Sequence, residues 1–362
     1  MNPKKKALAA AAVGTAAGVA GLAIIAMPAD AGEAPELPAV SAEELVQSVI
    51  TTPPPALNGS VKLTNNLGLP VGLPGTGALT ADSARVFTDG QGHSKITTQK
   101  GAGEQTVVHN GSTVWTYNSG SNTATKTTLP AGADGKHAPE AGGQAADPAA
   151  IASKVLGAVR ESSTVSVEGT ANVAGRAAYE LVLTPKPTER TLLREVRVAV
   201  DAEKRLPLEL SVLSNGSPDP ALQVGFTDVS FTPQAANLFE FTPPAGAKVT
   251  EQQPKIDQRD KDKAKAEIQQ NLKTVGTGWD TVLVGQLPAD ALSDMGKGKA
   301  GEHGRNVDPK AILDRVSKPV SGAFGTGHVV TTKVGTALLT DDGRVAAGFV
   351  PEQVLVEALG TK

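Results

Sequence analysis

The sequence predicts an α+β fold, in which an unclosed antiparallel β half-barrel is covered by helices and followed by a smaller C-terminal α+β module. Short segments of alternating hydrophobicity follow one another along much of the chain, bounded by Gly, Pro, Asn or charged turn residues. Two amphipathic helical stretches accompany them, which is typical of an α+β arrangement. The 362 residues also include 39 glycines and 25 prolines but only 3% aromatic residues, which indicates many turns.

The clearest strand pattern lies between Glu104 and Pro130. Asn110-Gly111 is the dipeptide that a tight hairpin turn favours. The strands predicted here are Thr106–His109, Thr113–Tyr117 and Thr123–Leu129. Alternation along the middle strand places Trp115 and Tyr117 on the same face. These two side chains are either ordinary core residues or the lining of an apolar concavity on a curved sheet.

Two helices are predicted beside this meander. The first begins at Ser41, which forms a capping box with Glu44, and Pro53-Pro54-Pro55 prevents its continuation. Its apolar stripe consists of Leu45, Val46, Val49 and Ile50. The second begins at Asp147-Pro148, with Asp at the N-cap and Pro at the first position.

Further strands and two irregular stretches complete this region. The other predicted strands are Gly59–Leu67, Ala84–Thr88, Lys95–Thr98, Thr164–Glu168, Ala177–Thr184, Leu193–Val200, Leu206–Leu213 and Leu222–Phe231. Leu67–Gly77 is apolar but interrupted by Gly and Pro, so it is either a lid with exposed Leu and Val or a simple connector. Ala131–Asp147 is rich in Gly and Ala, and we expect a mobile loop.

The N-terminal segment predicts export. Lys4, Lys5 and Lys6 precede an uncharged run from Ala7 to Ala29, and Ala29-Asp30-Ala31 fits a signal-peptidase site. The alternative is an uncleaved membrane anchor formed by residues 7–29, since the run is long enough to span a bilayer. In either case the rest of the chain is expected outside the cytoplasm, in the extracellular space or the cell envelope.

The C-terminal part has a different composition. A highly charged stretch after residue 250 is predicted to be a solvated helical linker. Beyond it we expect a strand at Trp279–Val284, a helix from Asp308-Pro309 through Val316, a hairpin of Val329–Leu339 with Val345–Val350 around Asp341–Arg344, and a closing helix at Pro351–Leu359. The predicted organisation is thus a signal or anchor at 1–31, a spacer at 32–40, the half-barrel at 41–250, the linker at 251–275 and the module at 276–362.

The composition excludes several classes of function. The chain has no cysteine, so disulfides, thiolate metal sites, cysteine nucleophiles and a lipid-modified N-terminal cysteine are all excluded. A net charge of −3 gives no reason to expect a nucleic-acid partner. The five histidines are far apart, and no hydrolase, metalloprotease or phosphate-loop motif occurs. We therefore expect a protein that is not an enzyme and has no metal and no cofactor.

The stretch HNGSTVWTYNSGSNTATKTTLP, residues 109–130, resembles the signature of the LolA-like family of outer-membrane lipoprotein carriers, in which a DG-x-x-[VL]-W-x-Y hairpin precedes a threonine-rich strand. The resemblance continues through Val173–Lys186, Val196–Val212 and Phe226–Val249, covers roughly Ser41 to Val249, and is to an actinobacterial-type member. It implies an unclosed β-barrel whose helix-covered cavity takes the acyl chains of lipoproteins or lipids.

The resemblance and the apolar strand residues together suggest which side chains line such a cavity. The cavity candidates are Trp115, Tyr117, Leu181, Leu183, Val198, Val200, Leu208, Leu210, Phe226, Phe239 and Phe241. The candidates for a lid or mouth are Arg85, Leu69, Val71 and Leu73, with a solvent-facing strand arginine as the alternative for Arg85. Alternation divides the cavity candidates between two faces, and the pattern does not say which face is concave.

Two functional hypotheses follow. The first is an exported carrier that binds lipid or lipoprotein acyl chains, since burial of each methylene contributes about 0.8 kcal/mol. The second is a sensor or regulatory protein of the same fold, RseB-like, that acts on a membrane protein partner; the extra C-terminal module and the charged linker favour it. A weaker third hypothesis is a structural wall-associated protein with a filled core. The carrier is the preferred interpretation.

Overall fold

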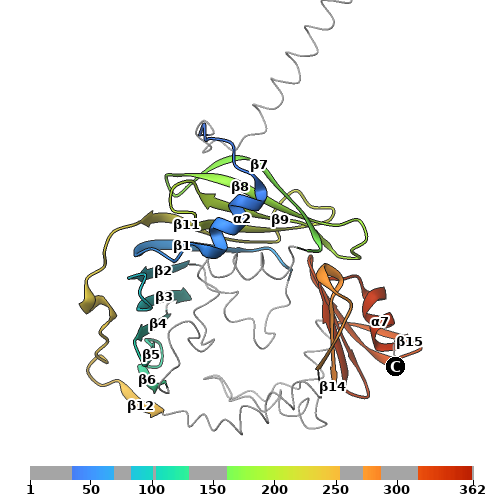
Figure 1. The fold of residues 1–362 in the computed structure, drawn as a ribbon. Helices are drawn as coiled ribbons and strands as arrows, with labels where there is room; N and C mark the ends of the chain where they lie inside the picture. Colours follow the sequence, from blue (N-terminus) through green and yellow to red (C-terminus); the bar gives the residue numbers. More distant parts are fainter. Residues whose placement is uncertain are drawn as a thin grey trace, which may run out of the picture.

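The computed structural model describes residues 35–68, 83–100, 103–129, 161–252, 272–286 and 317–360. Most of them belong to two β-sheets, one of twelve strands and one of six (Figure 1). The export signal, the lid residues Leu69, Val71 and Leu73, the loop at Ala131–Asp147, the helix from Asp147 and the helix from Asp308 lie outside the described residues.

The larger sheet consists of two meanders joined through its middle. In sheet order β12-β6-β5-β4-β3-β2-β1-β11-β10-β9-β8-β7, β1 pairs with β11, and Asn58 lies opposite Ser230. The strands are β1 (Leu57–Asn65), β2 (Ser83–Thr88), β3 (Ser94–Lys100), β4 (Gly103–Asn110), β5 (Thr113–Asn118), β6 (Thr123–Thr128), β7 (Ser163–Val173), β8 (Arg176–Pro185), β9 (Leu193–Asp201), β10 (Pro207–Ser214), β11 (Leu222–Ser230) and β12 (Lys248–Gln252). Neighbours are antiparallel except β6 and β12, which are parallel. The sheet is unclosed, with β12 and β7 at its edges.

Each strand predicted between Gly59 and Phe231 is confirmed. Most differ from the prediction only at their ends, but β7 continues past the predicted end at Glu168 to Val173. The first helix, α2 (Ala42–Thr51), is confirmed as well: the Ser41 Oγ accepts the Glu44 N–H at 3.2 Å, and the helix stops before the proline run. Three members of its predicted stripe are buried, namely Leu45, Val46 and Val49. The prediction for Ile50 is wrong, because this side chain follows Val49 around the helix, away from the sheet, and is 48% exposed.

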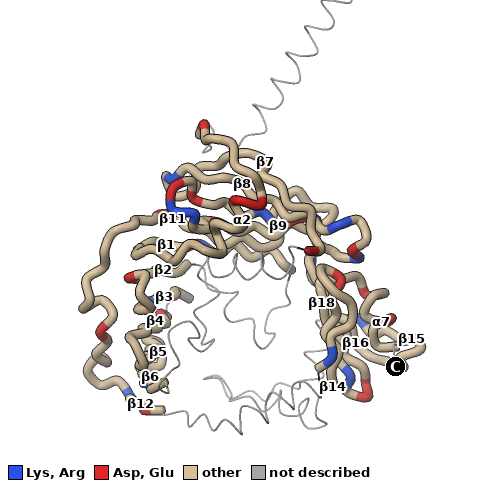
Figure 2. Tube along the Cα trace, in the orientation of Figure 1, with Lys and Arg blue, Asp and Glu red and all other residues tan. Residues whose placement is uncertain are grey.

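The strand register gathers the large apolar side chains on one face of the sheet. One row runs through Leu181, Val198, Leu210 and Val224, from β8 to β11. The buried residues of α2 belong to the same core cluster, so we call this side the covered face. Along β3–β6 the same face carries mainly small or polar uncharged residues, with threonine the commonest. Figure 2 shows how the charged residues are distributed along the chain. Large apolar surface is therefore concentrated beside α2.

The opposite face of β2–β6 is crossed by residues 231–247, which we call the strap. Figure 1 shows the strap running outside β2–β6 from β11 to β12. It contains the short helix η4 (Ala236–Phe239), and the Phe241 ring lies 5.4 Å from that of Trp115 and 5.8 Å from that of Tyr117. These ring contacts fix the strap to the outer face, and the strap in turn delivers β12 to the edge beside β6.

The smaller sheet has the order β13-β14-β18-β17-β16-β15. Its elements are β13 (Leu272–Val275), η5 (Gly278–Asp280), β14 (Val282–Gln286), β15 (Lys318–Gly322), β16 (Gly325–Thr331), β17 (Thr336–Thr340), β18 (Arg344–Gly348) and α7 (Glu352–Gly360). The hairpin around Asp341–Arg344 and the closing helix are confirmed. The helix α7 packs on one face of the sheet through Val354, Leu355 and Ala358.

Three expectations for this region are wrong, and one strand was not expected. Val329–Leu339 is two strands, because a turn held by the Thr332 Oγ1, which accepts the Gly335 N–H at 3.0 Å, divides it. Trp279 lies in η5, and its strand starts only at Val282. The strand β13 occupies 272–275, where a helical linker was expected, and β15 was not predicted.

The two sheets are joined by buried contacts around Trp279. Its indole is 4% exposed and lies in the core of the larger sheet, where Nε1–H donates to the Ser163 Oγ at 2.8 Å. Its backbone N–H donates to the Glu189 carboxylate at 2.7 Å. The Leu192 N–H also donates to the Phe349 carbonyl at 2.8 Å. Side-chain packing and backbone hydrogen bonds therefore both attach the smaller sheet to the larger one.

Candidate functional site

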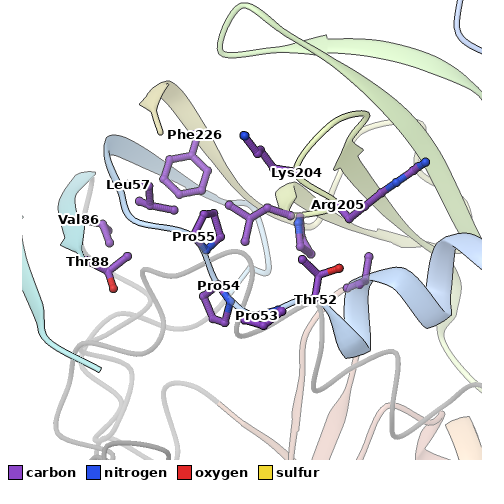
Figure 3. A pocket seen from close by; sticks show the side chains of 13 residues that line it. Thr52, Pro53, Pro54, Pro55, Leu57, Val86, Thr88, Lys204, Arg205 and Phe226 are labelled. Carbon is purple, nitrogen blue, oxygen red and sulfur yellow. The ribbon is translucent and has the colours of Figure 1, made fainter. Parts of the chain in front are cut away.

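An apolar pocket of about 150 Å³ lies where α2 ends against the covered face of the sheet (Figure 3). We call it the proline pocket. Its lining residues are Val49, Thr52, Pro53, Pro54, Pro55, Leu57, Val86, Thr88, Lys204, Arg205, Leu206, Pro207 and Phe226. They come from the end of α2, from β1, β2 and β11, and from the hairpin between β9 and β10.

The sequence explains why the proline pocket forms at this place. A helix cannot continue into Pro53-Pro54-Pro55, so the chain leaves α2 in an extended form and reaches β1. Prolines have no backbone N–H, so their segment forms one wall without exposing donors to an apolar space. The Phe226 ring forms another wall by lying over Gly59, where an added Cβ would be 2.8 Å from Phe226 Cδ1.

The hairpin between β9 and β10 forms the charged side of the pocket. Figure 3 shows the side chains of Lys204 and Arg205 leaving the apolar lining, with their nitrogens turned away from it. The Arg205 guanidinium lies over the Tyr179 ring, 5.2 Å from its centroid. The backbone of Arg205 has a φ of +56°, a conformation that non-glycine residues rarely adopt.

An ion pair holds the same hairpin in place. The Asp201 carboxylate is fully buried and accepts hydrogen bonds from Arg176 Nε at 2.7 Å and Nη2 at 3.0 Å. It also accepts the backbone N–H groups of Glu203 and Lys204. Burial alone raises the pKa of Asp201, but the hydrogen bonds from Arg176 and from the backbone outweigh it, so this pKa lies below its usual value.

The structure places ten of the eleven predicted cavity residues in three groups. The largest group, which lies in the covered-face core and is at most 1% exposed, consists of Leu181, Leu183, Val198, Val200, Leu208 and Leu210. None of these six lines the proline pocket. Phe226 alone of the eleven lines the proline pocket. Trp115, Tyr117 and Phe241 form a half-buried aromatic cluster under the strap, on the opposite face.

The eleventh cavity candidate, Phe239, and the described lid candidate, Arg85, lie on the outer side as well. Phe239 contributes to a second, more polar pocket of about 510 Å³, together with Asp89, His93 and Glu240. The Asp89 carboxylate meets His93 Nδ1 at 2.5 Å. Arg85 is exposed, and its register opposite Ser60 places it away from the covered face. Its position agrees with the alternative that Arg85 is a solvent-facing strand arginine. The candidates therefore lie on both faces of the larger sheet.

Most lining residues of the proline pocket were missed from the sequence. The proline run was recognised only as a helix stop, and Lys204-Arg205-Leu206-Pro207 only as a turn followed by a strand. A proline run directly after an amphipathic helix was the available signal, but alternation could not show that a distant hairpin lies opposite it. The partners come together only through the pairing of β1 with β11.

The described ranges contain no cluster of three His, Asp or Glu side chains that could hold a metal ion. Within the same ranges, no helix combines the length and the apolar character needed to cross a membrane.

No protein-family model and no curated protein matches the chain. Among solved structures, MucB in the Pseudomonas aeruginosa MucA/MucB complex is similar at 14% identity, over 87% of this chain and 94% of that one, with a TM-score of 0.42. A LolA superfamily protein from Nitrosomonas europaea is similar at 13% identity, over 56% and 99%, with a TM-score of 0.23. A putative outer membrane lipoprotein-sorting protein domain from Vibrio parahaemolyticus is similar at 10% identity, over 55% and 94%, with a TM-score of 0.19. The LolA-like resemblance seen in the sequence thus recurs among solved structures.

Proposed function

We propose that this chain is an exported, non-enzymatic binding protein that carries the acyl chains of lipoproteins or lipids. The observation that supports the proposal is the proline pocket, an apolar space beside the covered face with walls of Val, Leu, Pro and Phe. Such walls suit a hydrocarbon chain, because each buried methylene contributes about 0.8 kcal/mol and needs no polar partner. Export is part of the proposal and rests on the N-terminal signal or anchor.

The size of the pocket limits what it holds. Pockets for drug-sized ligands occupy roughly 300–1,000 Å³, whereas the proline pocket measures about 150 Å³. It therefore receives one segment of an acyl chain, and the rest of the ligand extends beyond it. Binding by the pocket alone is expected to be weak, as suits a carrier that must release its cargo.

The proposal can be tested with a pocket-filling variant and a matched control. Thr52 is exposed and lines the pocket, whereas the neighbouring Thr51 is exposed and does not line it. Thr52→Trp should weaken binding of decanoate, measured by titration calorimetry, while Thr51→Trp should leave it unchanged. Mass spectrometry of protein purified without detergent should also recover acyl species. Equal binding by both variants, or no binding of decanoate by the unchanged protein, contradicts the proposal.

A second candidate function is regulation of a membrane protein partner. The attachment of the smaller sheet through Trp279 and Glu189 favours it, because a simple acyl carrier has no evident need of a second sheet docked in this way. Cross-linking in intact cells, followed by identification of the linked membrane protein, tests this function. Protein that is free of acyl species and linked to one membrane protein would favour regulation over carriage.

A further inference from the structure

The hairpin beside the proline pocket has two acidic and two basic side chains, and only the acidic ones are paired. Arg176, on β8, holds both of them: its guanidinium contacts Asp201 as described above and donates to Glu203 at 3.1 Å. Within the described residues, no hydrogen bond or ion pair joins the side chain of Lys204 or Arg205 to an acid. The rim of the pocket therefore carries an excess of positive charge.

Arg205 is held in place at an energetic cost. Its Nη1 is buried and has no hydrogen-bond partner. A buried guanidinium nitrogen without an acceptor is unfavourable, and the contact with the Tyr179 ring offsets only part of that cost. The positive φ adds backbone strain. An anion beside the guanidinium would remove the electrostatic part of this cost, because it neutralises the charge that burial penalises.

We propose that the proline pocket takes an amphiphile with an anionic head, a carboxylate or a phosphate. The apolar tail lies among Pro54, Leu57 and Phe226, and the head binds Arg205, while Lys204 adds positive charge at the rim of the pocket. This inference rests on the proposed function and names the class of ligand that it serves.

The geometry accommodates both ends of such a molecule. Lys204 and Arg205 both line the pocket, and Figure 3 shows their side chains extending to different sides of it, with the nitrogens turned away from the apolar lining. Arg205 as a whole is partly exposed, so a head group can reach its side chain from solvent. Arginine binds carboxylates and phosphates through charge-assisted hydrogen bonds, which are stronger than neutral ones. A neutral head would leave the charge uncompensated, and a cationic head would be repelled.

The test compares probes that share one tail and differ in the head. Decanoate, decyl phosphate and the neutral decyl glucoside are titrated into the full chain by calorimetry. Both anionic probes should bind more tightly than the glucoside, and added salt should weaken only the anionic ones. The relative affinity of decanoate and decyl phosphate distinguishes a fatty acid from a phospholipid head as the natural source.

Substitutions of Arg205 test whether this residue causes the preference for anionic heads. Arg205→Gln should weaken binding of the anionic probes about tenfold, the usual effect of one charge-assisted hydrogen bond, and leave the glucoside unchanged. Arg205→Lys should retain most of the preference, and Lys62→Gln, which removes an exposed lysine of β1, should change nothing. The salt dependence of the unchanged protein tests the idea even if Arg205→Gln does not fold.

The possible failures are distinguishable. If all three probes bind equally and without salt dependence, or if Arg205→Gln weakens all three alike, the anionic-head inference is wrong while acyl binding stands. If no probe binds, the proposed function fails and the inference fails with it.

Discussion

Replacing Arg176 with methionine should destabilise the protein by leaving a buried carboxylate without its cation. Asp201 is 0% exposed and would retain only two backbone N–H donors. Breaking a buried ion pair from one side costs about 3–5 kcal/mol. The Arg176 side chain is 27% exposed, so water can partly replace it, and we expect a loss near the lower end, about 3 kcal/mol. Methionine preserves the apolar stem of the side chain, which limits the change to the charged group.

The loss can be measured by urea unfolding of Arg176→Met at neutral pH, followed by circular dichroism. The matched control is Arg190→Met, because Arg190 pairs with Glu357 at 2.6 Å while both side chains are more than half exposed; its effect on stability should be far smaller than that of Arg176→Met. Adding Asp201→Asn to Arg176→Met should restore part of the stability, since it removes the stranded charge. The reasoning is refuted if both single variants lose the same amount, or if the double variant is less stable than Arg176→Met.

Three further predictions concern other parts of the fold. The depressed pKa of Asp201 contributes stability that is fully present above the unfolded-state pKa and is lost as the pH falls through the folded-state pKa. As the pH falls below the ordinary aspartate pKa of 3.8, the free energy of unfolding should therefore decrease less steeply for Asp201→Asn than for the unchanged protein; parallel curves contradict this. Trp279→Ala should cost about 3–5 kcal/mol and speed amide hydrogen exchange in β13 and β14; unchanged exchange there would show that the smaller sheet does not depend on this side chain. Gly59→Ala places a Cβ 2.5 Å from the Asp228 carbonyl and should cost about 1–3 kcal/mol in urea unfolding, whereas Gly120→Ala, whose Cβ has only a contact at 3.4 Å, should be nearly neutral.

Local signals predicted local structure well. The capping pair Ser41 and Glu44 located the start of α2, and Asn110-Gly111 located a hairpin turn, because each signal acts within a few residues. Alternation likewise identified the strands of both meanders, since the side-chain period of a strand depends only on its own backbone.

Contacts between distant segments could not be predicted in this way. The strand β12 is exposed at all five positions and shows no pattern; it exists because the strap carries it to β6. Trp115 and Leu181 were both predicted to line the cavity, yet the strand register places them on opposite faces of the larger sheet. The proline pocket needs α2, β1 and the hairpin with Arg205 together, and no short window of sequence contains that arrangement.

The pairing of β1 with β11 also governs the order in which the chain can fold. Each meander joins strands that are neighbours in sequence, so each can form early, whereas bringing Asn58 to Ser230 closes a very long loop and should be slow. Until β11 (Leu222–Ser230) pairs with β1, one edge of β1 has unpaired backbone donors and acceptors that can bind a strand of another molecule. A chain truncated before residue 222 would therefore be prone to aggregation, even though nearly every other strand of the first two hundred residues has its partner.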